Sequence, residues 1–305
     1  MNLALSIVIP SFRRKESLLK LLKALVAQQE ITAEIIVVDQ NAPGYLRDVL
    51  AELPVVKHLL LTVPNASDAR NRGFLASTGE IVLFIDDDLV PEDDFCIRAL
   101  RIFQSYPAID CWSPLVYSEE GKEKALEQAL ARRVRVLDGD SGIFSITDTI
   151  SAAVFFRRAY FSRTGGFDPM LFEFAKTAED QEFFLRMRRR GLDLFFVPSV
   201  QIYHDEKIPG GCDLRTQDYW ITRERCMKSW AYRYRIQHHP PGPLSAKDLY
   251  GLARSGFLNR EVIASGFKET RRQMQLLFRS IKASDAFLKE RIGSYLPAEQ
   301  MDHLL

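Results

Sequence analysis

The sequence has 305 residues, of which 47% are hydrophobic and 27% are charged, with a formal net charge of +1. This composition is typical of a folded globular protein and excludes a disordered chain. The cysteines lack the close spacing of a zinc or redox site, and no apolar run is suited to a signal peptide or a membrane span. We therefore expect a cytoplasmic protein without a transmembrane segment.

Hydrophobic periodicity predicts alternating strands and helices in the first part of the chain. Short apolar runs predict strands at 3–10, 35–38, 55–61 and 81–85, and helical spacing of apolar residues predicts helices at 17–29 and 67–76. The continuous Ile and Val content of 35–38 favours a parallel strand that is buried on both faces. This order predicts an α/β fold, a doubly wound mixed and mostly parallel sheet flanked by helices, with ligands at the carboxyl ends of its strands.

The middle and the end of the chain follow a less regular pattern. Helices are predicted at 92–105 and 122–136, extended segments at 110–117, 152–156 and 194–197, and a helix that begins at Glu179 and Asp180. After His204 the sequence becomes aromatic and basic, with helical periodicity at 219–235 and 269–291.

Three consecutive aspartates, Asp86, Asp87 and Asp88, follow the predicted strand at 81–85. Three adjacent carboxylates repel one another unless a cation neutralises them, and their oxygens suit Mg²⁺ or Mn²⁺ with positions left for diphosphate oxygens. A helix cap, the alternative, needs only one aspartate. Asp39 ends a second strand at the same edge, where it is either a turn residue or an acceptor for a nucleobase N–H or a ribose hydroxyl.

Short motifs occur in a fixed order within residues 4–210. They are Ser-Ile-Val-Ile-Pro-Ser-Phe at 6–12, Ile-Val-Val-Asp at 36–39, Ala-Arg-Asn-Arg-Gly at 69–73, Phe-Ile-Asp-Asp-Asp at 84–88, Gly-Gly-Phe-Asp at 165–168 and Glu-Asp at 179–180. Each motif alone is weak, but together they resemble family 2 glycosyltransferases of the GT-A fold, of the nonprocessive, bacterial surface-polysaccharide type.

The resemblance implies a role for the residues at the ends of the first strands. Pro10, Ser11 and Phe12 would form the first nucleotide-contacting loop, and Asp39 would read the base. Arg70 would lie near the base or the diphosphate.

The same resemblance implies a metal and a catalytic base. Asp86 would contact the ribose or a metal-bound water, with Asp87 beside it in the donor site, while Asp88 would ligate Mn²⁺ or Mg²⁺ at the diphosphate. Asp180 would deprotonate the acceptor hydroxyl, although acids at a helix start are also common without a function. His204 resembles a histidine that joins the metal or the diphosphate; a lone histidine is otherwise more often a surface or packing residue.

In terms of reaction, the resemblance implies an inverting transfer of a single sugar from a nucleotide-diphosphate donor to a hydroxyl of a glycan or lipid-linked acceptor, in surface polysaccharide or glycan synthesis. Residues 1–212 would form the GT-A catalytic domain and residues 213–305 a mainly helical region. The chain departs from the family at Gln40 and Asn41, where a second acid is common, and at Arg13, where asparagine is frequent.

Two other classes of protein share the predicted fold. A sugar nucleotidyltransferase would need a glycine-rich loop after the first strand, and residues 11–15 contain no glycine. A non-catalytic GT-A-like binding protein would be favoured only if the acidic residues of the site were missing. Asp86, Asp88 and Asp180 are all present.

The region at 215–291 holds sixteen Lys and Arg against seven Asp and Glu. This charge favours peripheral contact with an anionic inner membrane face or with a phosphate-bearing acceptor. A solvated helical face is an equally open interpretation. No nucleic-acid reader motif accompanies the charge, so we expect no nucleic-acid partner.

Overall fold

The computed structural model describes residues 4–28, 30–31, 33–169, 179–189, 191–208, 211, 246, 250, 253–254, 258, 260–272 and 274–275. The chain divides into two compact units, Met1–Cys212 with Ser294–Leu305 and Asp213–Gly293. None of the helices in these described ranges has the length and apolar character that crossing a bilayer requires.

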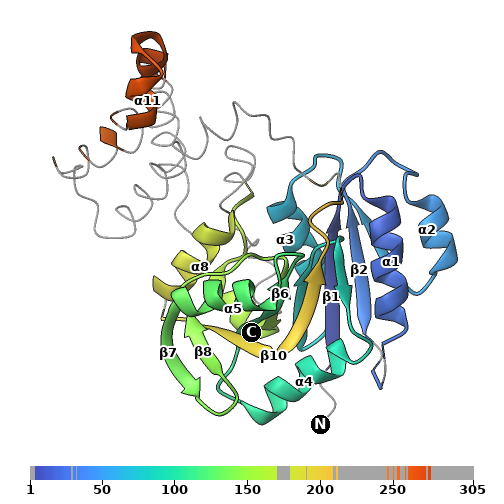
Figure 1. Cartoon of the computed structure of the whole chain (residues 1–305). Coiled ribbons are helices and arrows are strands. Elements are labelled where there is room, and N and C mark those ends of the chain that lie inside the picture. The colour runs from blue at the N-terminus through green and yellow to red at the C-terminus, as the bar shows by residue number, and fades with distance from the viewer. Residues whose placement is uncertain are drawn as a thin grey trace. The chain divides into compact units, whose positions relative to one another are not determined.

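The first unit alternates strands and helices along the chain (Figure 1). Its first elements are β1 (Leu5–Ser11), α1 (Lys15–Val26), β2 (Glu34–Asp39), α2 (Arg47–Glu52), β3 (Lys57–Leu60), α3 (Ala66–Ala76), β4 (Ile81–Ile85), β5 (Leu89–Pro91) and α4 (Phe95–Ser105). They are followed by β6 (Cys111–Tyr117), α5 (Lys122–Ala131), β7 (Arg133–Asp138), β8 (Ile143–Ile146), β9 (Ala153–Arg157), α6 (Arg158–Thr164), α8 (Glu179–Arg189) and β10 (Leu194–His204). In the second unit, α11 spans Arg260–Ala264.

The strands form one mixed sheet in the order β3-β2-β1-β4-β9-β6-β10-β8-β7, and β5 pairs with β10. The half β3-β2-β1-β4 is parallel throughout. In the other half β6 and β10 are parallel, while β9, β8 and β7 join by antiparallel pairs. The predicted α/β mixed sheet is confirmed, and its parallel pairs are concentrated in the first half.

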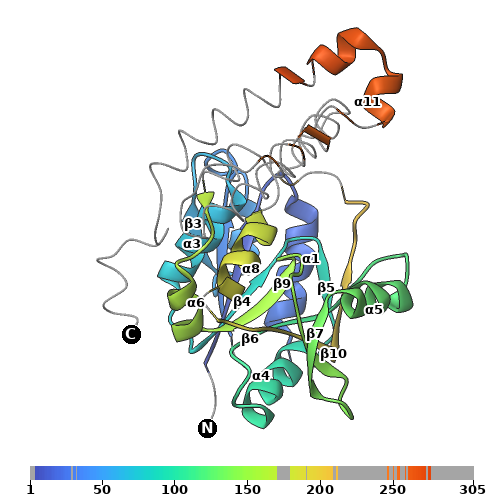
Figure 2. The same ribbon diagram turned by 90° about the vertical axis from the view of Figure 1, so that its left-hand side faces the viewer.

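Helices cover both faces of the sheet, and alternate residues of a strand pack on opposite faces. On β2, Ile35 and Val37 join the core beneath α1, α2 and α4, whereas Ile36 and Val38 join the core beneath α3, α6 and α8. Figure 2 shows α3, α6 and α8 together on one side of the sheet. Because each face is covered, the strand is apolar throughout, as its composition predicts.

The helix predicted at 122–136 is wrong in its second part. α5 ends at Ala131, and Arg133–Asp138 forms the strand β7, which pairs antiparallel with β8. Val134 and Val136 are exposed and alternate with charged residues. That alternation has the period of a strand, and pairing with β8 outweighs local helix propensity.

Other predicted elements differ in extent. The strand predicted at 194–197 continues to His204, because β10 resumes its pairing with β6 after an irregularity between Val197 and Gln201. The helix predicted at 219–235 lies outside the described residues. Of the helix predicted at 269–291, residues 269–272 and 274–275 are described and are helical.

Gly73 brings α3 close to β1. A Cβ at this position would lie 2.2 Å from Cγ1 of Val8, so a larger residue would push the helix away from the strand. This close packing holds Arg70, one helical turn earlier, near the carboxyl ends of the neighbouring strands.

Candidate active site at the carboxyl edge of the sheet

Asp86, Asp87 and Asp88 follow β4 directly, and contacts with distant parts of the chain hold their backbone. The Asp88 carbonyl accepts from the Asp205 N–H at 3.0 Å. The Ser17 hydroxyl on α1 donates to the Asp87 carbonyl. Asp87 and Asp88 are buried, and Asp86 is half-buried. The triplet is therefore a fixed part of the sheet edge and not a loose turn.

Arg14, in the turn between β1 and α1, pairs with two of these carboxylates. Its Nη1 lies 2.6 Å from Asp88 Oδ2 and 3.2 Å from Asp87 Oδ1. Burial raises the pKa of Asp87 to about 7, although Arg14 favours the ionised form. Arg14 was not among the residues predicted from the sequence, even though a cation directly after β1 must lie near the end of the adjacent strand β4.

Arg70 on α3 is the second cation of the site. Its Nη2 donates to Asp86 Oδ1 at 2.9 Å, and its Nη1 lies 3.8 Å from Glu179 Oε1 at the start of α8. Burial raises the pKa of Asp86 to about 6. Burial, with the neighbouring charge of Asp180, raises the pKa of Glu179 to about 8. Arg70 thus links the end of β4 to the acidic start of α8.

His204 lies beside Asp88 because β10 pairs antiparallel with β5, where His204 is the register partner of Leu89. Its Nε2 is 3.3 Å from Asp88 Oδ2, and its Nδ1 is 3.8 Å from Glu206 Oε1. Burial lowers the pKa of His204, but the hydrogen bond and charge of Asp88 outweigh this effect and leave the pKa raised.

One oxygen of Asp88 has no partner of its own. Asp88 Oδ1 is buried without a hydrogen bond, as is Arg70 Nη1, among the residues that the structure describes. A buried, unpaired carboxylate oxygen is costly, so it favours a ligand that supplies a positive charge or a donor. Over the same described ranges no group of three or more His, Cys, Asp or Glu side chains is arranged to hold a metal ion. Asp88 and His204 are two adjacent candidate ligands, and Asp88 Oδ2 also pairs with Arg14.

Asp39, at the end of β2, is buried and its carboxylate is held by its own neighbours. Oδ1 accepts from the Asn41 N–H at 3.0 Å and from the Asn41 amide at 2.7 Å. His58 Nε2 on β3 lies 3.1 Å from Oδ2. Gln40 Oε1 accepts from the Asn65 N–H at 2.7 Å, at the start of α3. The two residues that depart from the family pattern thus have structural partners here.

The predicted nucleotide loop lies beside Asp39. Ser11 is its register partner across β1 and β2, and the Ser11 carbonyl accepts from the Gln40 N–H at 2.9 Å. Pro10 lies at the end of β1, and Phe12 follows with the Arg13 guanidinium 4.7 Å from its ring centre. Pro10, Ser11, Phe12 and Asp39 therefore share one edge of the sheet.

Asp180, on the first turn of α8, contacts the segment before β9. The Ser151 hydroxyl donates to Asp180 Oδ1, and Ser151 itself is buried. Burial raises the pKa of Asp86 and Arg70 opposes it, and the charges of Asp88 and then of Asp180 raise this pKa further. Asp180 is therefore electrostatically coupled to the aspartate triplet across the sheet edge.

The motif at 165–168 positions α8. Arg186 donates to the carbonyl of Gly166 at 2.6 Å and pairs with Glu182 at 2.6 Å. On the other side, Asn71 of α3 accepts from the Phe167 N–H at 2.9 Å and donates to the Phe167 carbonyl at 2.8 Å. The turn thus joins α3 to α8, and the motif at 69–73 supplies both the site cation Arg70 and this support.

The family model "Glycosyl transferase family 2" matches residues 6–165. An uncharacterized glycosyltransferase of Nostoc sp. is 27% identical over 130 residues, which cover 41% of this chain and 40% of the relative. The alignment thus spans about two fifths of that protein.

Solved structures share the fold at low identity. A mannosyltransferase from Pyrobaculum calidifontis, in complex with GDP-Man and Mn²⁺, matches with a TM-score of 0.59 and 15% identity, covering 94% of this chain and 76% of that one. S. aureus TarS 1–349, in complex with UDP-GlcNAc, matches with a TM-score of 0.59 and 14% identity, covering 96% and 93%.

Proposed function

Because this chain belongs to glycosyl transferase family 2, we propose that it transfers one sugar from a nucleoside-diphosphate donor to an acceptor hydroxyl with inversion at the anomeric carbon. The observation that carries the proposal is the position of Arg70, between Asp86 and Glu179. A sugar transfer needs stabilisation of the leaving diphosphate on one side and a base on the other. Arg70 links Asp86, two residues before the proposed metal ligand Asp88, to Glu179, which directly precedes the proposed base Asp180.

Asp88 and His204 are the residues that would hold a divalent cation. The buried Asp88 Oδ1 lacks a partner in the described part of the chain, and carboxylate oxygen suits Mn²⁺ or Mg²⁺. The related mannosyltransferase structure contains Mn²⁺ with GDP-Man, which supports the same choice. When bound, such a cation would offset the negative charge of the departing diphosphate.

Asp180 is the proposed base. The Ser151 hydroxyl donates to Oδ1, which orients the carboxylate and leaves Oδ2 to accept the proton of the acceptor hydroxyl. The adjacent carboxyl, Glu179, pairs with Arg70. One base and no second carboxylate assigned as a nucleophile favour a single displacement, and hence inversion.

Pro10, Ser11, Phe12 and Asp39 are proposed to hold the nucleoside. Asp39 is rigid because Asn41 and His58 fix its carboxylate. A carboxylate has about four acceptor positions, so these contacts leave capacity for a base N–H.

The metal assignment is tested by nucleotide binding. We expect UDP or GDP to bind more tightly with Mn²⁺ than with EDTA, and Asp88→Asn to remove that difference because the variant lacks a charged ligand. Isothermal titration calorimetry on wild type and variant measures both. Glu92→Gln, an exposed acid beyond β5, is the matched control. Equal binding with Mn²⁺ and with EDTA in the wild type would contradict a metal at the donor site.

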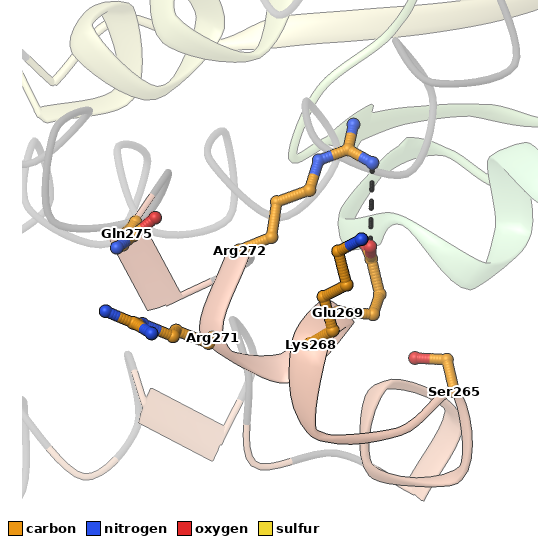
Figure 3. A pocket seen from close by; sticks show the side chains of 6 residues that line it. All are labelled: Ser265, Lys268, Glu269, Arg271, Arg272 and Gln275. Atoms are coloured by element: carbon orange, nitrogen blue, oxygen red, sulfur yellow. Dashed lines mark ion pairs between the residues drawn. The ribbon is translucent and has the colours of Figure 1, made fainter.

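The second unit is proposed to contact a lipid-linked acceptor or the anionic membrane face. Lys268, Arg271 and Arg272 line an open cavity of about 620 Å³, with Arg272 paired to Glu269 at 3.5 Å (Figure 3). Next to them, the Phe267 side chain is 84% exposed. Cations beside an exposed aromatic ring are a combination that binds at a lipid headgroup layer.

Vesicle sedimentation tests this contact. We expect the protein to sediment with vesicles that contain phosphatidylserine, and less so as salt rises, because screening weakens attraction to the surface. Phe267→Ser should weaken sedimentation without changing nucleotide binding. If the same amount of protein sedimented with neutral and with anionic vesicles, the membrane contact would be contradicted, and these residues would be a solvated surface.

A further inference from the structure

A second cavity, in the first unit, adjoins the site on the side away from the nucleotide residues. It has a volume of about 210 Å³, and the side chains that bear on its chemistry are Tyr117, Lys124, Gln128, Ile150, His204 and Glu206. They come from the end of β6, from α5, from the segment before β9 and from the end of β10. None of these residues was a candidate from the sequence except His204.

The cavity touches both parts of the proposed reaction machinery. His204 is 3.3 Å from Asp88, the proposed metal ligand. Ile150 directly precedes Ser151, whose hydroxyl donates to Asp180, the proposed base. The nucleotide residues belong to β1 and β2, whereas the cavity lies at β6 and β10, beyond β4 and β9 in the sheet. Its ligand is therefore a part of the substrates other than the nucleoside.

The lining is suited to a neutral, hydroxylated group. Lys124 is already paired with Glu120 at 2.5 Å, and His204 lies between Asp88 and Glu206. An anionic ligand would have to displace these partners and face the carboxylates. A sugar hydroxyl both donates and accepts, which matches the carboxylate of Glu206 and the two-sided amide of Gln128.

Apolar surface completes the lining. Ile150 is 46% exposed, and the Tyr117 ring is held edge-on to Tyr203 at 5.6 Å between centroids. Such surface covers the C–H faces of a sugar ring while polar groups reach its hydroxyls. A volume of about 210 Å³ is below the roughly 300 Å³ at which pockets for drug-sized ligands begin, so it suits a single ring.

We propose that this cavity is a subsite for one sugar ring, either the ring being transferred or the terminal ring of the acceptor. The proposal rests on the proposed glycosyl transfer. The transferred ring and the acceptor ring present the same kinds of hydroxyl groups and C–H faces. Only the transferred ring is attached to the nucleotide when it binds.

The test uses three variants of α5 in the full chain. Gln128→Ala removes the amide, Gln128→Trp fills the cavity, and Glu127→Ala changes the neighbouring exposed residue outside the lining. Thermal melting confirms that each variant folds. Wild type is first assayed for release of nucleoside diphosphate from UDP-glucose, UDP-GlcNAc and GDP-mannose, with water and with a panel of aryl glycosides as acceptors. Lack of turnover in the wild type would refute the proposed function, and the subsite with it.

With an active donor in hand, all variants should bind the free nucleoside diphosphate as wild type does. If the cavity holds the transferred ring, KM for the nucleotide sugar in hydrolysis should rise by about threefold to tenfold in Gln128→Ala and by more in Gln128→Trp. If it holds the acceptor ring, hydrolysis should be unchanged and KM for the aryl glycoside should rise instead. Both KM values within twofold of wild type in Gln128→Trp would overturn the subsite while leaving glycosyl transfer intact.

Discussion

The two halves of the sheet hold their functional groups in different ways. In the parallel half, β3-β2-β1-β4, Asp39 is fixed by Asn41 and His58, and both partners belong to that half. In the other half, the pairing of β10 with β5 places His204 beside Asp88, which lies three residues after β4. The Asp39 carboxylate is therefore held within the parallel half, whereas His204 pairs with a carboxylate of the opposite half. Changes in the mixed half should therefore mainly lower turnover. Changes in the parallel half should mainly lower the free energy of unfolding or alter its dependence on pH.

The largest effect is expected in the mixed half, at Asp180. Asp180→Asn keeps the shape and the contact with Ser151 but removes the proton acceptor, so turnover should fall by about 10²–10⁴-fold. The dissociation constant of the nucleotide should stay close to wild type, because the nucleotide residues lie in the parallel half. Steady-state kinetics with calorimetry on the same preparation measures both.

Two results would contradict this assignment of Asp180. Wild-type turnover in Asp180→Asn would remove it from the mechanism. Loss of nucleotide binding would instead give it a role with the diphosphate and would weaken the distinction between the halves. Glu182→Gln is not a suitable control, because Glu182 pairs with Arg186 inside the core; the exposed Asp140→Asn serves better.

A smaller effect, on stability, is expected in the parallel half at Arg14. Arg14→Met leaves the buried carboxylates of Asp87 and Asp88 without their cation, which should lower the free energy of unfolding by about 3 kcal/mol in EDTA. Mn²⁺ should recover part of this loss, because a metal supplies the missing positive charge. The rise in Tm on adding Mn²⁺ should then be greater in the variant than in wild type.

Arg13→Met is the matched control, since Arg13 is exposed and next in sequence. Its Tm should respond to Mn²⁺ as wild type does. An unchanged response in Arg14→Met would mean that Arg14 and the metal do not act on the same carboxylates.

The smallest effect concerns acid stability within the parallel half, at Glu34. Burial disfavours its charged form, but hydrogen bonds from Lys57, Ser6 and the Thr78 N–H outweigh burial and lower its pKa to about 2. A pKa below the ordinary value of 4.5 adds stability that is complete above pH 4.5 and is lost as pH falls toward 2. Glu34→Gln should therefore be less stable than wild type at pH 7, with the difference shrinking between pH 5 and 3.

Urea unfolding at a series of pH values measures this difference. Glu127→Gln, on the exposed face of α5, controls for the loss of a surface charge. The difference in the free energy of unfolding between Glu34→Gln and wild type could instead stay constant from pH 7 to 3. That result would show that the hydrogen bonds of Glu34 stabilise the fold whether or not its carboxyl is ionised.

The same contrast explains which parts could be predicted from the sequence. In the parallel half, β1, β2 and β4 are buried on both faces, so continuous apolar runs such as 35–38 and 81–85 predict both the element and its two buried faces. In the mixed half, β7 depends on β8, and the true end of β10 depends on β6 and β5. The alternation of Val134 and Val136 with arginines fits a strand, but it is short and directly follows a helix, so only the pairing with β8 separates the strand from a longer helix.

In the candidate site, some features could be predicted from the sequence and others could not. The positions of Asp86 and Asp88 after a buried strand and of Asp180 at a helix start could be predicted from the sequence, whereas their roles with a metal and as a base stay predictions. Arg14 was missed because a basic residue at a helix start is ordinary by itself, although its place directly after β1, beside the strand that precedes Asp87 and Asp88, is a signal that could have found it. The cavity at α5 could not be predicted, since Gln128 and Ile150 become neighbours only through the fold.

Gly211, seven residues after the end of β10, is anchored beside the end of β1. Its N–H donates to the Phe12 carbonyl at 2.8 Å, its φ is +69°, and a Cβ there would lie 2.9 Å from Cζ of Arg14. An insertion or deletion between His204 and Gly211 would shift this anchor along the chain and bring a side chain against Arg14. The residue that makes this hydrogen bond thus joins the part of the chain after β10 to the end of β1, beside the cation that pairs with Asp87 and Asp88.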